Sequence, residues 1–326
     1  MPRISMEREF SLWKEGRPLH RGEMDRFRSA LESRAAAIGI SCIDREVAHN
    51  SVEVKFSLID KASFADKLSS LRAGVEDISG SLGVRPCWTN QPAHAYPGHN
   101  EYFTTLAFPG TVDALVHANS LHVHFETPTE VAVHAYRQMN ALAPWFMTMS
   151  SMLGGGRGRL EMTGTLAREF GELILPQDFR SMADFSDFME RMSLMMRARM
   201  AREGTEAAAM AMFPRMFPDG GPLTLTPDKL FSPARIRPDL RLENGNISVE
   251  FRAIDAIASL EEETHMVGLA IAVYERVASG MSTQQGIAEA RGFLLGLSGG
   301  IGINPPTQSY SRKEGLEHEL VPATAA

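Results

Sequence analysis

The chain has 326 residues, of which 44% are hydrophobic and 22% are charged, and its formal net charge of -7 corresponds to a pI of about 5.8. This is the composition of a globular protein, and the lack of a dense Lys/Arg block argues against nucleic acid or an anionic membrane as a partner. No run of about 18 apolar residues is present, so the sequence predicts no membrane-spanning helix.

The N-terminal segment and the cysteines bear on the compartment. Met1 to Glu15 carries charges throughout and lacks an apolar core, so we expect no signal peptide. The two cysteines, Cys42 and Cys87, form neither a CxxC pair nor a disulfide framework, which is typical of a reducing compartment. The sequence therefore predicts a cytoplasmic protein.

Four segments alternate apolar and polar residues with the period of two that is typical of β-strands. They run from Ile4 to Leu12, from Val52 to Leu58, from Leu121 to Glu126 and from Ile247 to Ala253. One face of each is apolar, with Arg8 as the exception. The other face carries the ionisable residues Glu7, Glu9, Glu53, Lys55, His122, His124, Glu126, Glu250 and Arg252. This pattern predicts an antiparallel sheet with one packed face.

The ionisable faces of these strands predict a shared site. Solvent exposure explains the polar face of any single strand, but solvent faces usually carry Lys, Thr and Ser rather than a repeated set of Glu, His and Arg. If the strands are neighbours, their carboxylates converge on a concave surface and repel one another. A divalent cation is the natural partner of such a surface.

Amphipathic helices are predicted between the strands. Apolar residues spaced by three and four positions indicate helices from Met24 to Ile38, from Phe64 to Leu82 and from Val267 to Val277, each ended by or near a glycine. Glu130 to Leu153 indicates a long helix that Pro144 kinks or breaks. Helices on the apolar face leave the polar face for chemistry, so we expect an α+β fold; no GxGxxG or Walker A motif argues for a parallel doubly wound one.

The domain organisation is predicted to be simple. We interpret residues 1–303 as a single catalytic domain and 304–326, which are rich in Pro and polar residues, as a flexible tail. Met189 to Met216 is rich in methionine and indicates a helical segment used for adaptable packing or as a mobile lid. The sequence leaves open whether this segment and the glycine-rich Gly154 to Arg159 close over a substrate.

Five short motifs occur along the chain. They are Met6–Phe10 with its E-x-E pair, Glu46–Glu53, the H-V-H strand Leu121–His124, the helix Asn140–Ser151, and the E-x-R-x-x-D strand Ser248–Ala256. Each is unspecific alone, but together and in this order they resemble the glutamate–cysteine ligase family, carboxylate–amine ligases of the glutamine-synthetase-like superfamily. The resemblance implies a glutamine synthetase/guanidino kinase-like catalytic domain that uses ATP and Mg²⁺.

The carboxylate residues on these strands indicate a metal site. They are the hard oxygen ligands that Mg²⁺ prefers, and the predicted carboxylate ligands are Glu7, Glu9, Glu46, Glu53 and Glu250. The resemblance implies that His122 completes one metal site, and neutral imidazole also suits Mn²⁺.

Arg252 and Glu53 are the predicted catalytic residues. Arg252 lies one pleat from Glu250, and its planar guanidinium suits the oxygens of a transferring phosphoryl group; an ordinary Glu–Arg strand pair is the alternative. His124 is predicted to contact ATP phosphate or substrate, and the alternative is a structural histidine.

Three further residues are predicted to lie near the nucleotide. Arg235 and Arg237 precede the last strand, at a place where the resemblance implies an arginine close to nucleotide or substrate. The sequence does not choose between them. Lys55 either contacts the nucleotide or has no role in the site.

The predicted reaction joins a small-molecule carboxylate to an amine through an acyl phosphate formed from ATP. Only the resemblance implies glutamate as the carboxylate, and Gly154 to Arg159 departs from the family's Ser/Pro/aromatic turn, so both substrates stay open. The alternatives are a guanidino-kinase-like phosphotransferase, a metal-dependent hydrolase on the same sheet, and a non-catalytic binding protein. The oligomeric state, including a homo-oligomer, is also open.

Overall fold

The computed structural model describes residues 3–46, 48–91, 116–153, 158–171, 174–205, 232–240 and 244–277, together with isolated positions between 207 and 225. The predicted tail at 304–326 and most of the glycine-rich turn, residues 154–157, lie outside these ranges. No helix in the described part of the chain is long and apolar enough to span a bilayer.

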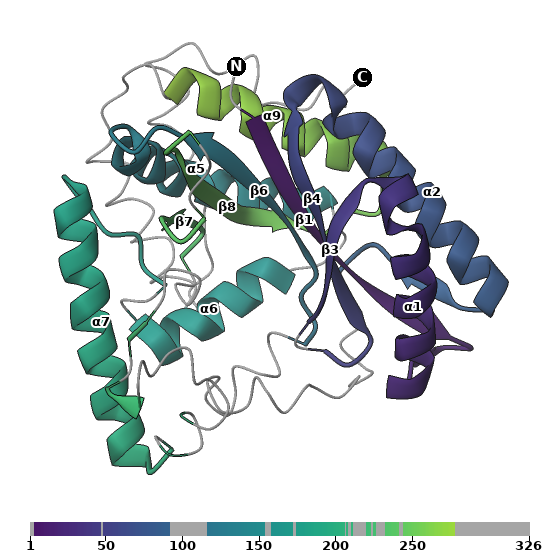
Figure 1. Ribbon diagram of the computed structural model, residues 1–326, viewed down its shortest axis with the longest axis horizontal. Coiled ribbons are helices and arrows are strands. Elements are labelled where there is room, and N and C mark those ends of the chain that lie inside the picture. Colours follow the sequence, from purple (N-terminus) through teal and green to yellow (C-terminus); the bar gives the residue numbers. More distant parts are fainter. Residues whose placement is uncertain are drawn as a thin grey trace.

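The described strands form one eight-stranded sheet in which neighbours pair in the order β3-β4-β1-β6-β8-β7, with β2 and β5 also paired to β1 (Figure 1). Their bounds are β1 (Arg3–Lys14), β2 (Arg17–Pro18), β3 (Ile40–Arg45), β4 (Ser51–Asp60), β5 (Arg85–Cys87), β6 (Ser120–Thr127), β7 (Ala234–Arg237) and β8 (Ile247–Asp255). Every pairing is antiparallel. The four predicted strands are β4, β1, β6 and β8, and they are consecutive in the sheet, so the predicted antiparallel α+β fold is confirmed.

Helices cover the apolar face of this sheet. The helical bounds are α1 (Arg21–Ile38), the 3-10 turn η1 (Lys61–Ser63), α2 (Phe64–Leu82), α5 (Ala132–Leu153), α6 (Gly158–Phe170), α7 (Met182–Glu203) and α9 (Leu260–Val277). Helices α1, α2, α9 and α5 contact one another in that order, and Figure 1 shows α1, α2 and α9 along one side of the sheet. The inward sheet residues are fully buried against them, as with Phe10, Val54, Val123 and Phe251.

Two glycines end the first two helices as the sequence predicted. Gly39 after α1 and Gly83 after α2 have φ of 84° and 64°, in the left-handed region, and their N–H groups bond to carbonyls of the last helical turn. A residue with a Cβ is strained in this region, which makes glycine the usual residue after a helix.

The long helix predicted around Pro144 is present, and of the two predicted outcomes, a kink or a break, the break is wrong. Helix α5 continues through Pro144 to Leu153. The proline removes one backbone donor, but the helix is held by other contacts: Asn140 Nδ2 donates to the carbonyls of Tyr136 and Ala234, both at 3.1 Å, and Phe146 packs edge-on against Phe251 of β8. Tertiary packing therefore outweighs the local preference.

The charged exception on the apolar face is part of a buried ion cluster. The Arg8 guanidinium pairs with Glu263 of α9, and its NH2 donates to the carbonyl of Trp88 at 2.8 Å. Arg72 of α2 binds the same carboxylate and lies 4.9 Å from the Trp88 ring centroid. The cluster of Arg8, Arg72 and Glu263 joins β1 to two of the helices that cover it.

The methionine-rich segment is helical from Met189 to Glu203 and is interrupted at Gly204. Helix α7 ends at Glu203, where Gly204 adopts φ of 68°, and most of the predicted continuation to Met216 lies outside the described residues. Met192 and Met196 are buried while Met195 is 40% exposed, so α7 packs through one face. The last two residues of the glycine-rich Gly154 to Arg159 begin α6.

Glu23 caps the N-terminus of α1. Its carboxylate accepts from Arg17 at 2.8 and 2.9 Å and from the His20 backbone N–H at 3.0 Å. These bonds lower the pKa of Glu23 from 4.5 to about 2. A carboxyl group whose pKa falls on folding stabilises the fold above its unfolded pKa and loses that contribution as the pH falls through the folded value.

We therefore expect Glu23→Gln to reduce the free energy of unfolding by about 0.5 to 1 kcal/mol at neutral pH. The deficit relative to wild type should shrink as the pH falls from about 4.5 to about 2. Urea unfolding at several pH values measures it. Glu32→Gln on the same helix, where the carboxylate lies 3.8 Å from Arg28, is the matched control and should change little. A deficit that persists undiminished near pH 2 would contradict the assignment.

Candidate active site

The predicted site residues meet on the polar face of five neighbouring strands, β4, β1, β6, β8 and β7. The cross-strand pairs are Glu9–Glu53, Glu7–Lys55, Glu7–His122, His124–Glu250 and Arg235–Glu250. The carboxylates and histidines of this face are all less than 9% exposed. Such burial of like charges is unfavourable unless each group has a partner.

Three groups of side chains could each hold a cation, because within each group the donor atoms lie within 4.8 Å of one another. The groups are Glu7–Glu53–His122, Glu7–His124–Glu250 and Glu9–Glu46–Glu53. Glu7 and Glu53 each belong to two groups, so the three positions are adjacent. All five predicted carboxylate ligands and both histidines are included, and Glu46 enters from the turn that follows β3.

A hydrogen-bond chain through Ser120 defines how His122 is oriented. The Ser120 hydroxyl donates to Glu9 Oε2 at 2.6 Å and lies 2.9 Å from His122 Nε2. A hydroxyl has one proton, so with that proton on Glu9 it must accept one from Nε2. In the neutral tautomer that fits this bond, the lone pair of His122 is on Nδ1, which lies 3.0 Å from Glu7 Oε2 and 3.9 Å from Glu53 Oε2.

A lone pair that faces two carboxylates is favourable only with a positive charge between them. A second proton on the ring is one source, but burial lowers the pKa of His122 even though the bond to Glu7 raises it. A metal ion is the other source, and a carboxylate and an imidazole nitrogen are suitable ligands. The geometry around His122 therefore fits a bound cation.

His124 offers a second open nitrogen. Its Nδ1 lies 3.1 Å from Ser248 Oγ. Its Nε2 is buried, lies 3.3 Å from Glu7 Oε1, and forms no hydrogen bond within the described residues. Buried polar atoms usually have partners, so this atom also fits a cation, as a ligand with Glu7 and Glu250. His124 thus lies beside the predicted metal ligands Glu7 and Glu250.

Lys55 and Glu53 show how the charges are balanced without a metal. Burial, together with Glu7 and Glu46, raises the pKa of Glu53 well above its usual value. Burial opposes ionisation of Glu7 as well, but His124 and His122 hold the pKa of Glu7 well below the usual range. The Lys55 ammonium lies 3.1 Å from Glu7 and 2.9 Å from Glu53, so it bridges two predicted metal ligands.

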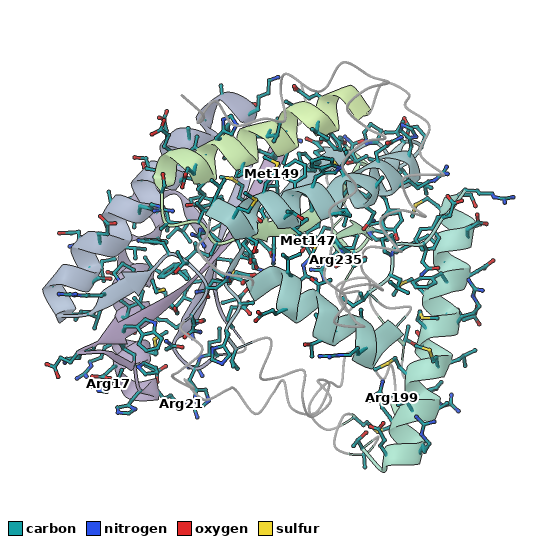
Figure 2. The ribbon with its side chains drawn as sticks, turned by 180° about the vertical axis from the view of Figure 1, so that it is seen from behind. Arg17, Arg21, Met147, Met149, Arg199 and Arg235 are labelled. Carbon is teal, nitrogen blue, oxygen red and sulfur yellow. The ribbon has the colours of Figure 1, made fainter. Side chains whose placement is uncertain are left out.

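Three arginines surround Glu250. Arg235 binds its carboxylate through two bonds of 2.6 and 2.8 Å, Arg237 lies 3.0 Å from Oε2, and Arg252 Nε lies 3.3 Å from Oε1. Figure 2 shows Arg235 near the middle of the view. Burial opposes ionisation of Glu250, yet Arg235 and its neighbours keep the pKa of Glu250 well below the usual value. Three guanidinium groups that converge on one place suit the binding of phosphate oxygens.

The two arginines that the sequence could not separate have different surroundings. Arg235 is 6% exposed and its two bonds to Glu250 form a parallel pair. Arg237 divides its contacts between Glu250 and Asp239, at 2.8 Å from the latter. Both lie within reach of the same carboxylate.

Sequence reasoning missed two serines. Ser120 and Ser248 precede His122 and Glu250 by two positions, on the same strand face, and their hydroxyls bond to His122 and His124. The period of two that selected the charged residues would also have selected them. They were passed over because serine on a strand is usually solvated.

Comparisons with known proteins support the fold. No family model and no curated protein sequence matches the chain. A bifunctional glutathione synthetase from Pasteurella multocida matches over 90% of this chain and 41% of its own, with 11% identity and a TM-score of 0.53. A glutamine synthase homologue matches over 98% and 63%, with 15% identity and a TM-score of 0.49, and GmaS without ligand over 92% and 65%, with 12% identity and a TM-score of 0.43.

These likenesses are to parts of larger proteins, because the chain spans less than two thirds of the length of each. At such low identity they establish the fold, and the match to the glutathione synthetase carries that conclusion. The narrower resemblance to the glutamate–cysteine ligase family stays a prediction.

Proposed function

We propose that this protein is an ATP- and divalent-metal-dependent carboxylate–amine ligase. The observation that carries the proposal is the position of His122 Nδ1 among carboxylates, 3.0 Å from Glu7 and 3.9 Å from Glu53, beside three guanidinium groups that converge on Glu250. A cation site adjacent to an oxyanion site is what the transfer of a phosphoryl group from a metal-bound nucleotide requires. The glutathione synthetase and glutamine synthase homologue named above agree with a ligase on this fold.

Mg²⁺ or Mn²⁺ is the proposed metal. Glu7, Glu53 and His122 would hold one ion, and Glu7, His124 and Glu250 a second. Glu9, Glu46 and Glu53 form the third candidate group. Metal bound there neutralises phosphate oxygens and the carboxylates that hold it.

The arginines are proposed to hold the phosphate groups. Arg235, Arg237 and Arg252 would bind the γ-phosphate oxygens while a substrate carboxylate oxygen attacks the γ-phosphorus and ADP leaves. The amine nitrogen then attacks the acyl carbon and loses a proton, and inorganic phosphate leaves with the former carboxylate oxygen. Glutamate is the proposed carboxylate on the resemblance alone, and the amine stays open.

Phosphate release from Mg-ATP tests the function. The purified protein is incubated with pools of amino acids and small amines, and products are followed by mass spectrometry. Phosphate release that needs two pooled compounds, with a product lighter by one water than their sum, would establish the ligase. ADP with a stable phosphorylated product would indicate a phosphotransferase, and a product formed without ATP a hydrolase. No ATP consumption and no Mg-ATP binding would refute the proposal.

Ser120 is proposed to orient His122 for metal binding, through the bonds of 2.9 Å to Nε2 and 2.6 Å to Glu9. Without the hydroxyl, the proton on Nε2 loses its acceptor and the ring can present the wrong nitrogen to the metal. We expect Ser120→Ala to weaken Mn²⁺ binding by about 10-fold to 100-fold, as is typical when a partner of a metal ligand is lost.

Calorimetric titration of the nucleotide-free protein with Mn²⁺ measures this affinity apart from activity. Ser57→Ala on the exposed part of β4 is the matched control and should bind as wild type does. Equal affinity of Ser120→Ala and Ser57→Ala would show that Ser120 does not set the orientation of His122.

A further inference from the structure

A pocket with positively charged walls lies between the start of α1 and the turn that joins β3 to β4. Its cavity volume is about 20 Å³, within about 280 Å³ of space between the walls that includes open solvent. Helix α1 contributes Arg21, Asp25 and Arg28, and the opposite wall consists of Arg45, His49 and Ser51. We call it the basic pocket. Figure 2 shows Arg21 at one edge of the molecule, far in that view from Arg235, so the pocket is distinct from the arginine cluster around Glu250.

The charges in the basic pocket do not cancel. Three guanidinium groups face one carboxylate, Asp25, which lies 2.9 Å from Arg45. Arg28 donates to the carbonyl of Ile43 at 3.2 Å and pairs at 3.8 Å with Glu32, which lies outside the pocket lining. Arg21 is exposed and has no ion pair among the residues that the structure describes. A surplus of positive charge therefore remains.

This surplus is not the general character of the surface. The chain as a whole has a net charge of -7, and the nearest part of the candidate active site is acidic. Glu46, in the third cation group, lies in the chain between Arg45 and His49 of the pocket wall. A concave positive site in an acidic protein, at the first turns of a helix whose dipole adds to it, favours an anion.

The pocket is also close to the reacting groups along β4. Ser51 of the pocket and Glu53 of the cation groups lie two residues apart on the same strand face, a separation of about 7 Å at the usual rise per residue. A small molecule in the basic pocket would therefore lie beside the cation groups, and it could bind there without entering the arginine cluster.

We propose that the basic pocket binds the oxyanion group, a phosphate or a carboxylate, of a small molecule. Guanidinium groups from two elements give the forked donors that such oxygens accept. The proposal does not depend on the ligase reaction, because the residues of the pocket are separate from the arginines proposed to hold ATP.

Calorimetric titration with inorganic phosphate and, separately, with succinate tests the proposal. The full chain is used at low ionic strength without nucleotide or metal, so that failure of the ligase proposal cannot affect the result. We expect wild type to bind at least one probe, and Arg21→Gln combined with Arg45→Gln to weaken that binding by about tenfold or more. Preferential loss of phosphate or of succinate binding identifies which oxyanion the pocket takes.

Arg26→Gln is the matched control, because Arg26 is exposed on the same helix and does not line the pocket. Arg21→Gln alone is a second test, since this side chain has no ion pair whose loss could disturb the fold, and it should weaken binding in the same direction. The proposal is overturned if wild type binds neither probe, if the double variant binds as wild type does, or if Arg26→Gln weakens binding equally.

Discussion

Glu53→Gln should reduce kcat by about 100-fold or more while leaving the metal-free protein at least as stable as wild type. The reason is that burial, Glu7 and Glu46 raise the pKa of Glu53, so its ionised form is unfavourable until a cation arrives. The unfolded chain ionises this carboxyl near its ordinary pKa, which means that it opposes folding increasingly as the pH rises from about 4.5 towards the folded value. Glutamine keeps the shape and removes that penalty.

Thermal unfolding in EDTA and in Mn²⁺, beside a turnover assay, measures both effects. In EDTA above about pH 4.5 the variant should unfold at the same temperature as wild type or higher, and in Mn²⁺ it should gain less stability. Glu76→Gln on the exposed side of α2 removes a charge far from the site and should change neither. A variant less stable than Glu76→Gln in EDTA would mean that the Glu53 charge is favourable without metal, which would contradict the cation argument.

Glu263→Gln should reduce the free energy of unfolding by about 3 to 5 kcal/mol, as loss of one partner from a buried ion pair typically does. Its carboxylate is 1% exposed and binds Arg8 and Arg72 together. Burial already lowers the pKa of Arg8 while Glu263 supports its charge. Removing the carboxylate leaves two guanidinium groups buried without a counterion.

Urea unfolding measures this loss, with Glu261→Gln as the matched control because Glu261 is exposed in the same first turn of α9. Replacing the whole cluster, with Arg8→Met, Arg72→Met and Glu263→Leu together, should restore much of the lost stability, since apolar residues of similar volume often replace a buried ion group at little cost. A loss below about 1 kcal/mol for Glu263→Gln would show that Arg8 and Arg72 do not need the Glu263 carboxylate as a counterion.

The same cluster bears on the active site. Arg8 lies between Glu7 and Glu9 in β1, and its guanidinium also donates to the backbone carbonyl of Glu9. The helix side of β1 therefore holds the backbone on which two predicted metal ligands are mounted. Activity lost in Glu263→Gln would act through this backbone and not through contact with substrate.

Local patterns were sufficient for much of the fold. Alternation in β1, β4, β6 and β8 and the three-four spacing of α1, α2 and α9 depend on neighbours within one element, so they are visible in the sequence. The glycines after α1 and α2 are also predictable from local sequence, because the left-handed backbone that ends a helix favours glycine. Pro144 was misjudged because the contacts of Asn140 that hold α5 come in part from β7, almost a hundred positions away.

The site divides in the same way. The residue types on one face of each strand are a property of the sequence by itself, and they determined that Glu7, Glu53, His122 and Glu250 would be candidates. That β4, β1, β6 and β8 are consecutive neighbours is a property of the tertiary structure. The hydrogen bonds of Ser120 to Glu9 and His122, which leave His122 Nδ1 facing carboxylates, also depend on the tertiary structure.

Distance and burial decide whether a charge repels, pairs or binds a cation, and both depend on strands far apart in the chain. The sequence therefore determined which groups are present and which way they face. Only the tertiary structure decided which groups meet, because the pairing of distant strands and the pKa shifts that follow arise from contacts between elements that no local pattern records.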